Sequence, residues 1–309
     1  SQIPSTNKSS AGQLKTMRLA QSCTAEYSNY FGANSVADVA LVVAAFNATL
    51  TRCNGVYEKD LALHLNLVAA SQNVIYYDPA TDPYSDAAAG SGGAWNYELM
   101  TTLSNNALVG NANFDVGHLF GASGGGGNAG CIGCVCDNTM TFTTDSNGVS
   151  HPDSYKGSGY TSPGDAIPMG DNFDIDYVTH EVGHQLGGNH TFTHSTENNA
   201  VNYEPGSGST IMGYAGITAR DIAAHSNDYY HAGSIAQIQT NLALPAKACP
   251  VNVAIAHGAP VVNAGSNYTI PKSTPFALTG SATDAGGGAL TYCWEQFDEA
   301  TTAAMLCSI

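Results

Sequence analysis

The feature that most constrains this chain is the segment HEVGHQLGGNH at residues 180–190. If the residues leading into it are helical, His180 and His184 lie one turn apart on the same face. Their Nε2 atoms can then reach one zinc ion at roughly 2.0–2.1 Å. Gly187 is expected to end the helix, because glycine adopts a positive φ at little cost. The chain then turns and brings His190 to the ion as a third ligand.

Glu181 is the candidate catalytic base of this site. It projects about 100° round the helix from His180, so it lies beside the metal and not on it. Three protein ligands leave a fourth position for water, which is typical of a catalytic zinc site, and Glu181 can take the proton of that water. The alternative is a helix whose histidines only pack or cap. Five fixed positions make a chance match to the extended motif rarer by roughly two orders of magnitude.

A second motif, STIMGY, lies at residues 209–214. With the extended histidine motif, it makes the chain resemble the metzincin clan of zinc endopeptidases, in which a methionine-containing turn lies beneath the three histidines. The resemblance implies that the polarisable side chain of Met212 packs beneath the three imidazoles. The alternative is an ordinary methionine of the hydrophobic core. It also implies that Tyr214 stabilises the tetrahedral intermediate, as in astacins and serralysins. The alternative is a packed aromatic whose hydroxyl reaches a backbone group.

Within the clan, the chain resembles bacterial, secreted reprolysin-like peptidases of the adamalysin type over residues 13–248. Residues 114–120, 180–192 and 204–214 carry this likeness. Thr191 departs from it, because the snake-venom adamalysins have aspartate after the third histidine. The Gly213-Tyr214 pair departs as well, since it follows the astacin and serralysin turn.

The resemblance also implies the fold. We expect an α+β metzincin-type domain with a mixed twisted sheet, an antiparallel edge strand, an active-site helix, the Met-turn and a C-terminal helix. In such domains the extended substrate lies antiparallel to the edge strand. We place that strand at residues 114–123, and expect His118 on it to be structural. The predicted substrate-binding residues are Gly117, His118, Leu119, Phe120 and Gly121.

Hydrophobic periodicity predicts the remaining elements. Strands are expected at 15–23, 60–69, 73–77 and 139–144, and helices at 35–50, 93–108 and 219–244. From about residue 250 the sequence consists of short stretches of alternating apolar and polar residues. These stretches resemble the opening strands of a PKD or Ig-like sandwich, in which Trp294 would be buried. We therefore expect a peptidase domain at 1–249 and a partial β module at 250–309.

Charge and hydropathy argue against several partners. The chain has 309 residues with 25 Asp and Glu against nine Lys and Arg, a net charge of −16. This balance argues against nucleic acid and anionic membranes. No apolar run approaches the roughly 20 residues of a membrane span, and the most hydrophobic stretch, 36–46, is too short. We expect a monomer that acts on proteins or peptides.

The acidic segment at residues 81–86 offers several oxygen ligands close together. A Ca²⁺ loop and a solvated acidic turn both fit this pattern, and the turn is the simpler interpretation. The cofactors predicted from the sequence are thus Zn²⁺, with Ca²⁺ left open.

Eight cysteines in an acidic chain indicate an oxidising exterior. The polar residues 1–12 hold no signal peptide, so we expect a secreted protein whose signal and pro-segment have been removed. An even count fits four disulfides of open connectivity, and a zinc knuckle at the CxxCxC cluster is the alternative. The cysteines form three groups: Cys23 with Cys53, which would staple the first helix; Cys131, Cys134 and Cys136 with Cys249; and Cys293 with Cys307.

These observations predict a secreted zinc-dependent endopeptidase. The alternative is a secreted adhesion or binding protein with a vestigial metal site, which the acidic surface and the sandwich-like tail favour weakly. An intact Glu181 argues against that alternative, because a binding-only descendant has no need of the base.

Overall fold

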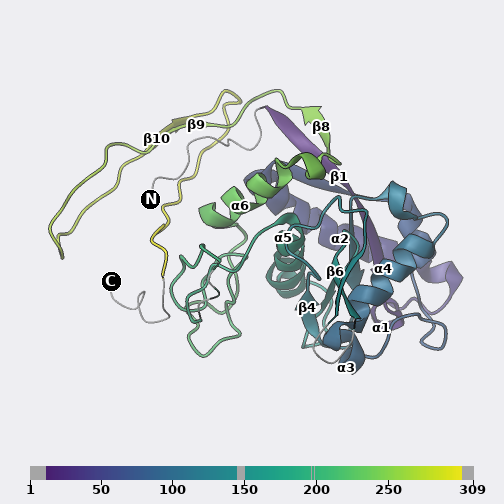
Figure 1. The fold of residues 1–309 in the computed structure, drawn as a ribbon. Coiled ribbons are helices and arrows are strands. Elements are labelled where there is room, and N and C mark those ends of the chain that lie inside the picture. Colours follow the sequence, from purple (N-terminus) through teal and green to yellow (C-terminus); the bar gives the residue numbers. More distant parts are fainter. Residues whose placement is uncertain (1–11, 145–149, 196, 198, 301–309) are drawn as a thin grey trace.

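The computed structural model describes residues 12–144, 150–195, 197 and 199–300, and its centre is a twisted six-stranded sheet (Figure 1). The strand order is β2-β1-β3-β7-β4, with β8 pairing with β1. Strands β2, β1, β3 and β7 run parallel, whereas β4 is antiparallel to β7 at one edge. The strands are β1 (Gln13–Cys23), β2 (Leu63–Leu67), β3 (Val116–Phe120), β4 (Gly126–Asn128), β7 (Gly159–Ser162) and β8 (Val251–Ala254). The expected mixed sheet with an antiparallel edge strand is confirmed.

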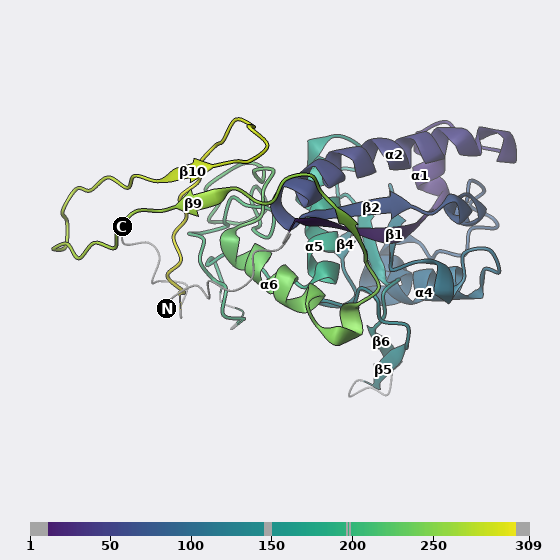
Figure 2. The same ribbon diagram turned by 90° about the horizontal axis from the view of Figure 1, so that it is seen from above.

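Helices cover both faces of this sheet, and Figure 2 shows α2 and α4 on opposite sides of β1 and β2. Successive residues of β1 point to opposite faces, so Leu19 joins the core under α2 and α5, and Ala20 joins the core under α4. Helix α2 (Val39–Val56) buries Val42, Phe46 and Cys53 at helical spacing. The other long helices are α4 (Trp95–Asn105), α5 (His180–Leu186) and α6 (Ala232–Leu242).

Several predicted elements have different bounds. The expected strand at 73–77 is a 3-10 turn, η3 (Ala69–Val74), followed by one bridge between Cys23 and Ile75. The expected C-terminal helix at 219–244 begins only at Ala232. The remaining elements are α1 (Ala25–Tyr30), α3 (Ala87–Ala89), β5 (Thr141–Thr144), β6 (Ser150–Ser154), β9 (Val261–Asn263), β10 (Ser281–Thr283), η1 (Val36–Asp38), η2 (Tyr57–Leu61), η4 (Gly90–Ala94), η5 (Asn111–Asn113), η6 (Asn172–Thr179) and η7 (Pro245–Lys247).

The prediction that residues 114–123 form the substrate-binding edge strand is wrong. Strand β3 lies between β1 and β7 and pairs with both, and all five of its residues are buried. Continuous burial is typical of a parallel strand covered on both faces. Gly117, His118, Leu119 and Phe120 therefore have no free edge to offer a peptide. Gly121 directly follows them and donates its N–H to Thr161 of β7.

Two disulfides lie among the described residues, Cys131–Cys134 and Cys136–Cys249. The zinc-knuckle alternative is thereby excluded, because all three cysteines of its cluster are oxidised. The predicted staple between Cys23 and Cys53 is wrong: both thiols are buried and unpaired, and Cys53 donates to the carbonyl of Asp174. The predicted partner of Cys293, Cys307, lies outside the described residues.

The C-terminal residues form a strand pair, not a sandwich, within the part of the chain that the structure describes. Strands β9 and β10 pair antiparallel and extend away from the main sheet (Figure 1). Trp294, predicted to be buried in a module core, is 48% exposed. Strand β8 lies just past the predicted boundary and pairs with β1. The division at residue 250 and the PKD or Ig likeness stay predictions.

One helical run, Val36–Leu61, is long and apolar enough to cross a membrane by length and composition alone. It is longer than the stretch 36–46 singled out in the sequence. In the fold its buried side chains, including Val42 and Phe46, pack in the main core beside the sheet. One side of the run therefore packs against the core, and 28% of its apolar window is buried.

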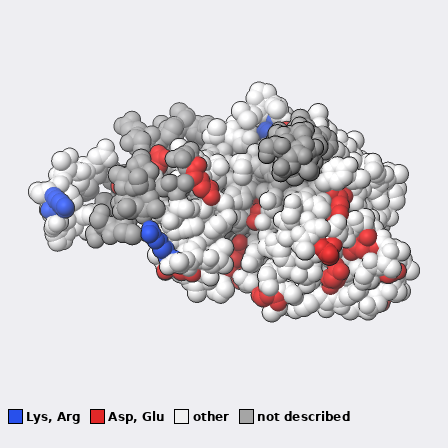
Figure 3. Space-filling model, turned by 60° about the horizontal axis from the view of Figure 1, so that its bottom comes forward, with Lys and Arg blue, Asp and Glu red and all other residues white. Residues whose placement is uncertain are grey.

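Acidic side chains are spread over the face shown in Figure 3, where few basic ones appear. In the acidic segment 81–86, Asp82 accepts hydrogen bonds from the backbone N–H groups of Ala25 and Tyr84. Asp86 caps the short helix α3 by accepting from Ala89. Backbone amides occupy these carboxylates, and Ca²⁺ binding stays an untested expectation.

Candidate metal centre

The segment that carries the histidines is continuous with the helical turn before it. The winding of η6 leads directly into α5, and α5 ends at Leu186. Gly187 follows with φ 120°, and its N–H donates to the carbonyls of Gly183 and His184. The expected glycine stop is confirmed, because only glycine adopts this φ without strain. The chain then reverses, which brings His190 back over the helix.

Three imidazole nitrogens meet at one point. The Nε2 atom of His184 lies 3.1 Å from that of His180 and 3.0 Å from that of His190, and the last two lie 3.3 Å apart. A tetrahedral zinc with bonds of roughly 2.0–2.1 Å keeps its ligand atoms about 3.3 Å apart. The three atoms thus have the spacing that one zinc ion requires.

The opposite nitrogen of each ring is held by an acceptor. The Nδ1 atoms donate to the carbonyl of Ile211 (2.6 Å from His180), the carbonyl of Gly188 (2.7 Å from His184) and the carboxylate of Glu197 (2.9 Å from His190). Because Nδ1 carries the proton, each Nε2 presents its lone pair to the others. Three converging lone pairs repel unless a cation lies between them, so this donor set fits zinc.

The environment keeps these rings neutral. Burial, and then the neighbouring imidazoles, hold the pKa of His180 well below its usual value. Burial lowers the pKa of His184 to about 3, and burial also lowers the pKa of His190. Neutral imidazole is the form that binds metal.

Glu181 lies beside the three rings and against strand β4. Burial raises the pKa of its carboxyl to about 8, while a hydrogen bond from the backbone N–H of Ala129 acts in the opposite direction. A Cβ on Gly127 would collide with the Glu181 carboxylate. The glycine of β4 thus lets this edge strand approach the carboxylate closely.

Met212 packs against helix α5, and the ring of Tyr214 lies beside those of His180 and His190. Met212 is fully buried, and its Sδ lies 2.7 Å from the place where a Cβ on Gly183 would be. The Tyr214 ring centre lies 4.5 Å from that of His190 and 5.6 Å from that of His180. Burial raises the pKa of Tyr214 to about 12, and the nearby carboxylates of Glu181 and Glu197 add to the shift.

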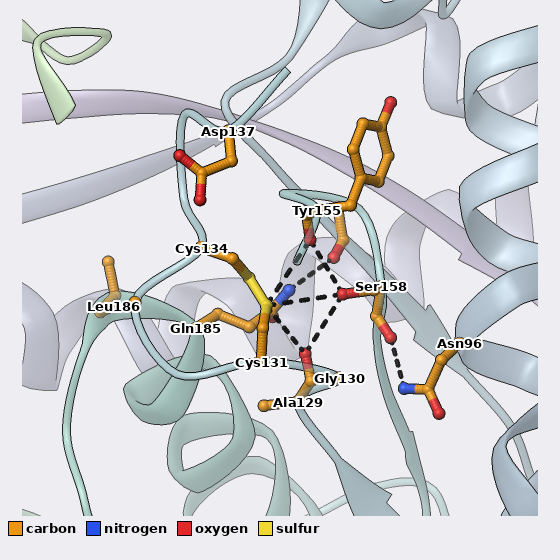
Figure 4. Close-up of a disulfide and its surroundings, with 12 residues drawn as sticks. Asn96, Ala129, Gly130, Cys131, Cys134, Asp137, Tyr155, Ser158, Gln185 and Leu186 are labelled. Atoms are coloured by element: carbon orange, nitrogen blue, oxygen red, sulfur yellow. Dashed lines mark hydrogen bonds between the residues drawn. A yellow bond between two sulfur atoms is a disulfide. The ribbon is translucent and has the colours of Figure 1, made fainter. Parts of the chain in front are cut away.

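A cleft opens on both sides of Glu181. Two hollows of about 320 Å³ and about 410 Å³ share Gly127, Glu181 and Tyr214 in their walls. The first continues past His180 and residues 213–217, and the second past His184, His190 and residues 127–132. Figure 4 shows the Cys131–Cys134 disulfide, of which Cys131 lines the second hollow. The Sγ atom of Cys131 lies 3.6 Å from the hydroxyl oxygen of Ser158. The two hollows thus meet at Glu181 from opposite sides.

His118 lies apart from this centre. Its Nδ1 contacts the amide oxygen of Gln185 and its Nε2 the hydroxyl of Thr161, both at 2.9 Å. Burial lowers the pKa of His118 to about 4. The interpretation of His118 as structural agrees with these contacts.

The sequence patterns did not predict two carboxylates near the metal centre, those of Glu197 and Glu204. Glu197 holds His190, and Glu204 holds the turn before Met212. Neither has a fixed spacing from the histidine motif that a pattern could detect. Glu204 does lie in the segment 204–214 that carries the family resemblance, but nothing in that segment indicates its contacts.

The mixed sheet, the three-histidine cluster and the buried methionine turn define a zinc metallopeptidase of the metzincin type. The family model described as Metallo-peptidase family M12B Reprolysin-like matches residues 13–242, and the chain belongs to this family. The expected reprolysin-like identity is thereby confirmed. No curated protein matches the chain. The matched range ends before the predicted C-terminal module.

Proposed function

We propose that this protein is a secreted zinc-dependent endopeptidase. The observation that carries the proposal is the convergence of three Nε2 lone pairs on one point, with Glu181 at their side. Membership of the M12B family supports metal-dependent cleavage of proteins or peptides. The two disulfides support an extracellular location, because oxidising compartments preserve such bonds.

The residues have distinct roles in this proposal. His180, His184 and His190 hold the metal, which when bound polarises the scissile carbonyl and lowers the pKa of water. A cation held by the histidines would favour the charged form of the Glu181 carboxyl and so offset the effect of burial. Glu181 then takes the proton of the attacking water at its carboxylate and passes it to the nitrogen of the leaving amine. Tyr214 donates its phenol hydrogen to the developing oxyanion, since a tyrosine hydroxyl keeps that hydrogen at neutral pH.

The substrate is proposed to lie along β4 in place of β3. Strand β4 pairs only with β7 in the described sheet, so its other edge is free to hydrogen-bond to an extended peptide. Gly127 of β4 borders both hollows beside Glu181. This position would thread the peptide past the carboxylate and the metal.

Replacing the proposed base tests the mechanism. We expect Glu181→Gln to keep its zinc and its melting temperature but to lower kcat for casein or a quenched peptide by a factor of about 10²–10⁴. Glu58→Gln, an exposed glutamate at η2, is the matched control and should cleave like the unaltered protein. A Glu181→Gln protein with near-normal kcat would refute the proposed base. Zinc binding by the unaltered protein without cleavage of any peptide in a library would instead favour the adhesion alternative.

A further inference from the structure

One buried carboxylate, that of Glu204, joins two segments of the metal centre. Its Oε1 accepts hydrogen bonds from the backbone N–H groups of Ser209 (2.9 Å) and Thr210 (3.0 Å). Its Oε2 accepts from the hydroxyls of Thr191 and Thr210. These four donors match the four lone-pair sites of a carboxylate.

The segments joined in this way are those that orient two metal ligands. Thr191 directly follows His190, and its N–H donates to the carbonyl of Met212 at 3.1 Å. Thr210 directly precedes Ile211, whose carbonyl accepts the Nδ1 hydrogen of His180. Glu204 therefore links the segment of the third ligand to the segment of the acceptor that orients the first.

The turn around the carboxylate is shaped to receive it. Gly208 has φ 72°, and a Cβ there would lie 3.1 Å from the Glu204 carboxylate. The backbone of Glu204 is used as well: its N–H donates to Thr191, and its carbonyl accepts from the hydroxyl of Thr193. A buried carboxylate is costly to desolvate unless its lone pairs are satisfied, as they are here.

We propose that Glu204 is a positioning residue of the metal centre, which keeps His190 and the acceptor of His180 at the spacing that one ion requires. Glu204 touches none of the three histidines and acts through Thr191 and Thr210. The proposal rests on the proposed zinc function. Outer partners of ligating histidines commonly change metal affinity by about 10–100-fold when removed.

Two substitutions test this role by different routes. Glu204→Gln keeps the side-chain shape but turns an NH₂ group toward donors. Thr191→Val removes one donor and keeps the volume, and Thr191→Ser restores the hydroxyl. For each variant, the test measures three quantities: the zinc dissociation constant by chelator competition, the visible spectrum of the Co²⁺-substituted protein, and the melting temperature without metal. Glu26→Gln, an exposed glutamate in the first turn of α1, is the matched control.

We expect Glu204→Gln and Thr191→Val to weaken zinc binding about 10–100-fold and to alter the Co²⁺ bands. Thr191→Ser and Glu26→Gln should bind zinc as the unaltered protein does. If Glu204→Gln does not fold, the comparison of Thr191→Val with Thr191→Ser tests the positioning role on its own. Variants that lower only the metal-free melting temperature, with unchanged zinc affinity and Co²⁺ bands, would overturn the positioning role while leaving the proposed function intact. An unaltered protein that binds no zinc would overturn both.

Discussion

Gly183 lies where helix α5 packs directly against Met212 of the Met-turn. A Cβ there would lie 2.7 Å from Sδ of Met212 and 3.0 Å from the ring of Tyr230. Alanine normally stabilises a helix interior relative to glycine by about 1 kcal/mol. Here overpacking reverses the sign, and we expect Gly183→Ala to lower the free energy of unfolding by about 1–3 kcal/mol and to weaken zinc binding. Urea unfolding and chelator competition measure the two effects.

Gly55 is the matched control for this prediction. It also lies inside a helix, near the end of α2, but a Cβ there would meet nothing within 4 Å. Gly55→Ala should therefore be neutral or stabilising by up to about 1 kcal/mol. If both substitutions stabilise the protein equally, the close packing of Met212 against the helix is not the reason for a glycine at position 183.

At the scale of elements, the loop after β4 forms one wall of the cleft and is tied to helix α5. The N–H of Gly133 donates to the carbonyl of His184, and Ala129 donates to Glu181. The Cys131–Cys134 bond closes a short loop there, whereas Cys136–Cys249 spans 113 residues. Since longer closed loops restrict the unfolded chain more, we expect replacement of Cys136 and Cys249 by serine to cost about 2–5 kcal/mol of stability, and of the other pair much less.

The short disulfide should influence catalysis instead. Cys131 and the half-exposed Ile132 line the cleft, so opening the Cys131–Cys134 bond loosens a wall of the proposed substrate site. We expect the double serine variant at Cys131 and Cys134 to raise KM several-fold with a near-normal melting temperature. Steady-state kinetics on one quenched peptide measures this. Equal KM values for this variant and the unaltered protein would exclude the loop from substrate contact.

The elements also show which parts of the fold the sequence could predict. Helix geometry places His180, Glu181 and His184, and the glycine stop at Gly187 lets the chain turn and bring His190 to them. The position of β3 depends on which strands pair with it, and a strand's own residues do not specify its partners. The contacts of Glu204 depend on the folding of the loop between His190 and Met212, which no sequence pattern specifies. Thr191 departs from the adamalysin aspartate, and its carboxylate partner comes from thirteen residues further along the chain.

At the scale of the whole molecule, buried carboxylates make stability depend on pH. Asp60 of η2 accepts the N–H of Tyr230 at 2.7 Å and so joins the end of the α2 run to the segment before α6. Burial raises the pKa of Asp60 to about 6. The folded state therefore holds this proton more tightly than the unfolded state. Its contribution to stability is fully present below about pH 4 and is lost as the pH rises through about 6.

Replacing Asp60 separates its contribution to stability from that of the histidines. The histidines titrate in the same way in the variant and in the unaltered protein, so their effect cancels in the difference between the two. Asp60→Asn keeps one oxygen as acceptor for the N–H of Tyr230 and removes the charge. As the pH rises from 4 to 7, the unfolding free energy of the variant should therefore gain roughly 1 kcal/mol relative to that of the unaltered protein. Asp38→Asn should show little change over this range, since the hydroxyl of Ser35 lowers the pKa of Asp38 and so places its titration below about pH 4. Urea unfolding of the metal-free proteins across this range measures both, and two parallel curves for Asp60→Asn and the unaltered protein would mean that solvent reaches Asp60 freely in the folded state.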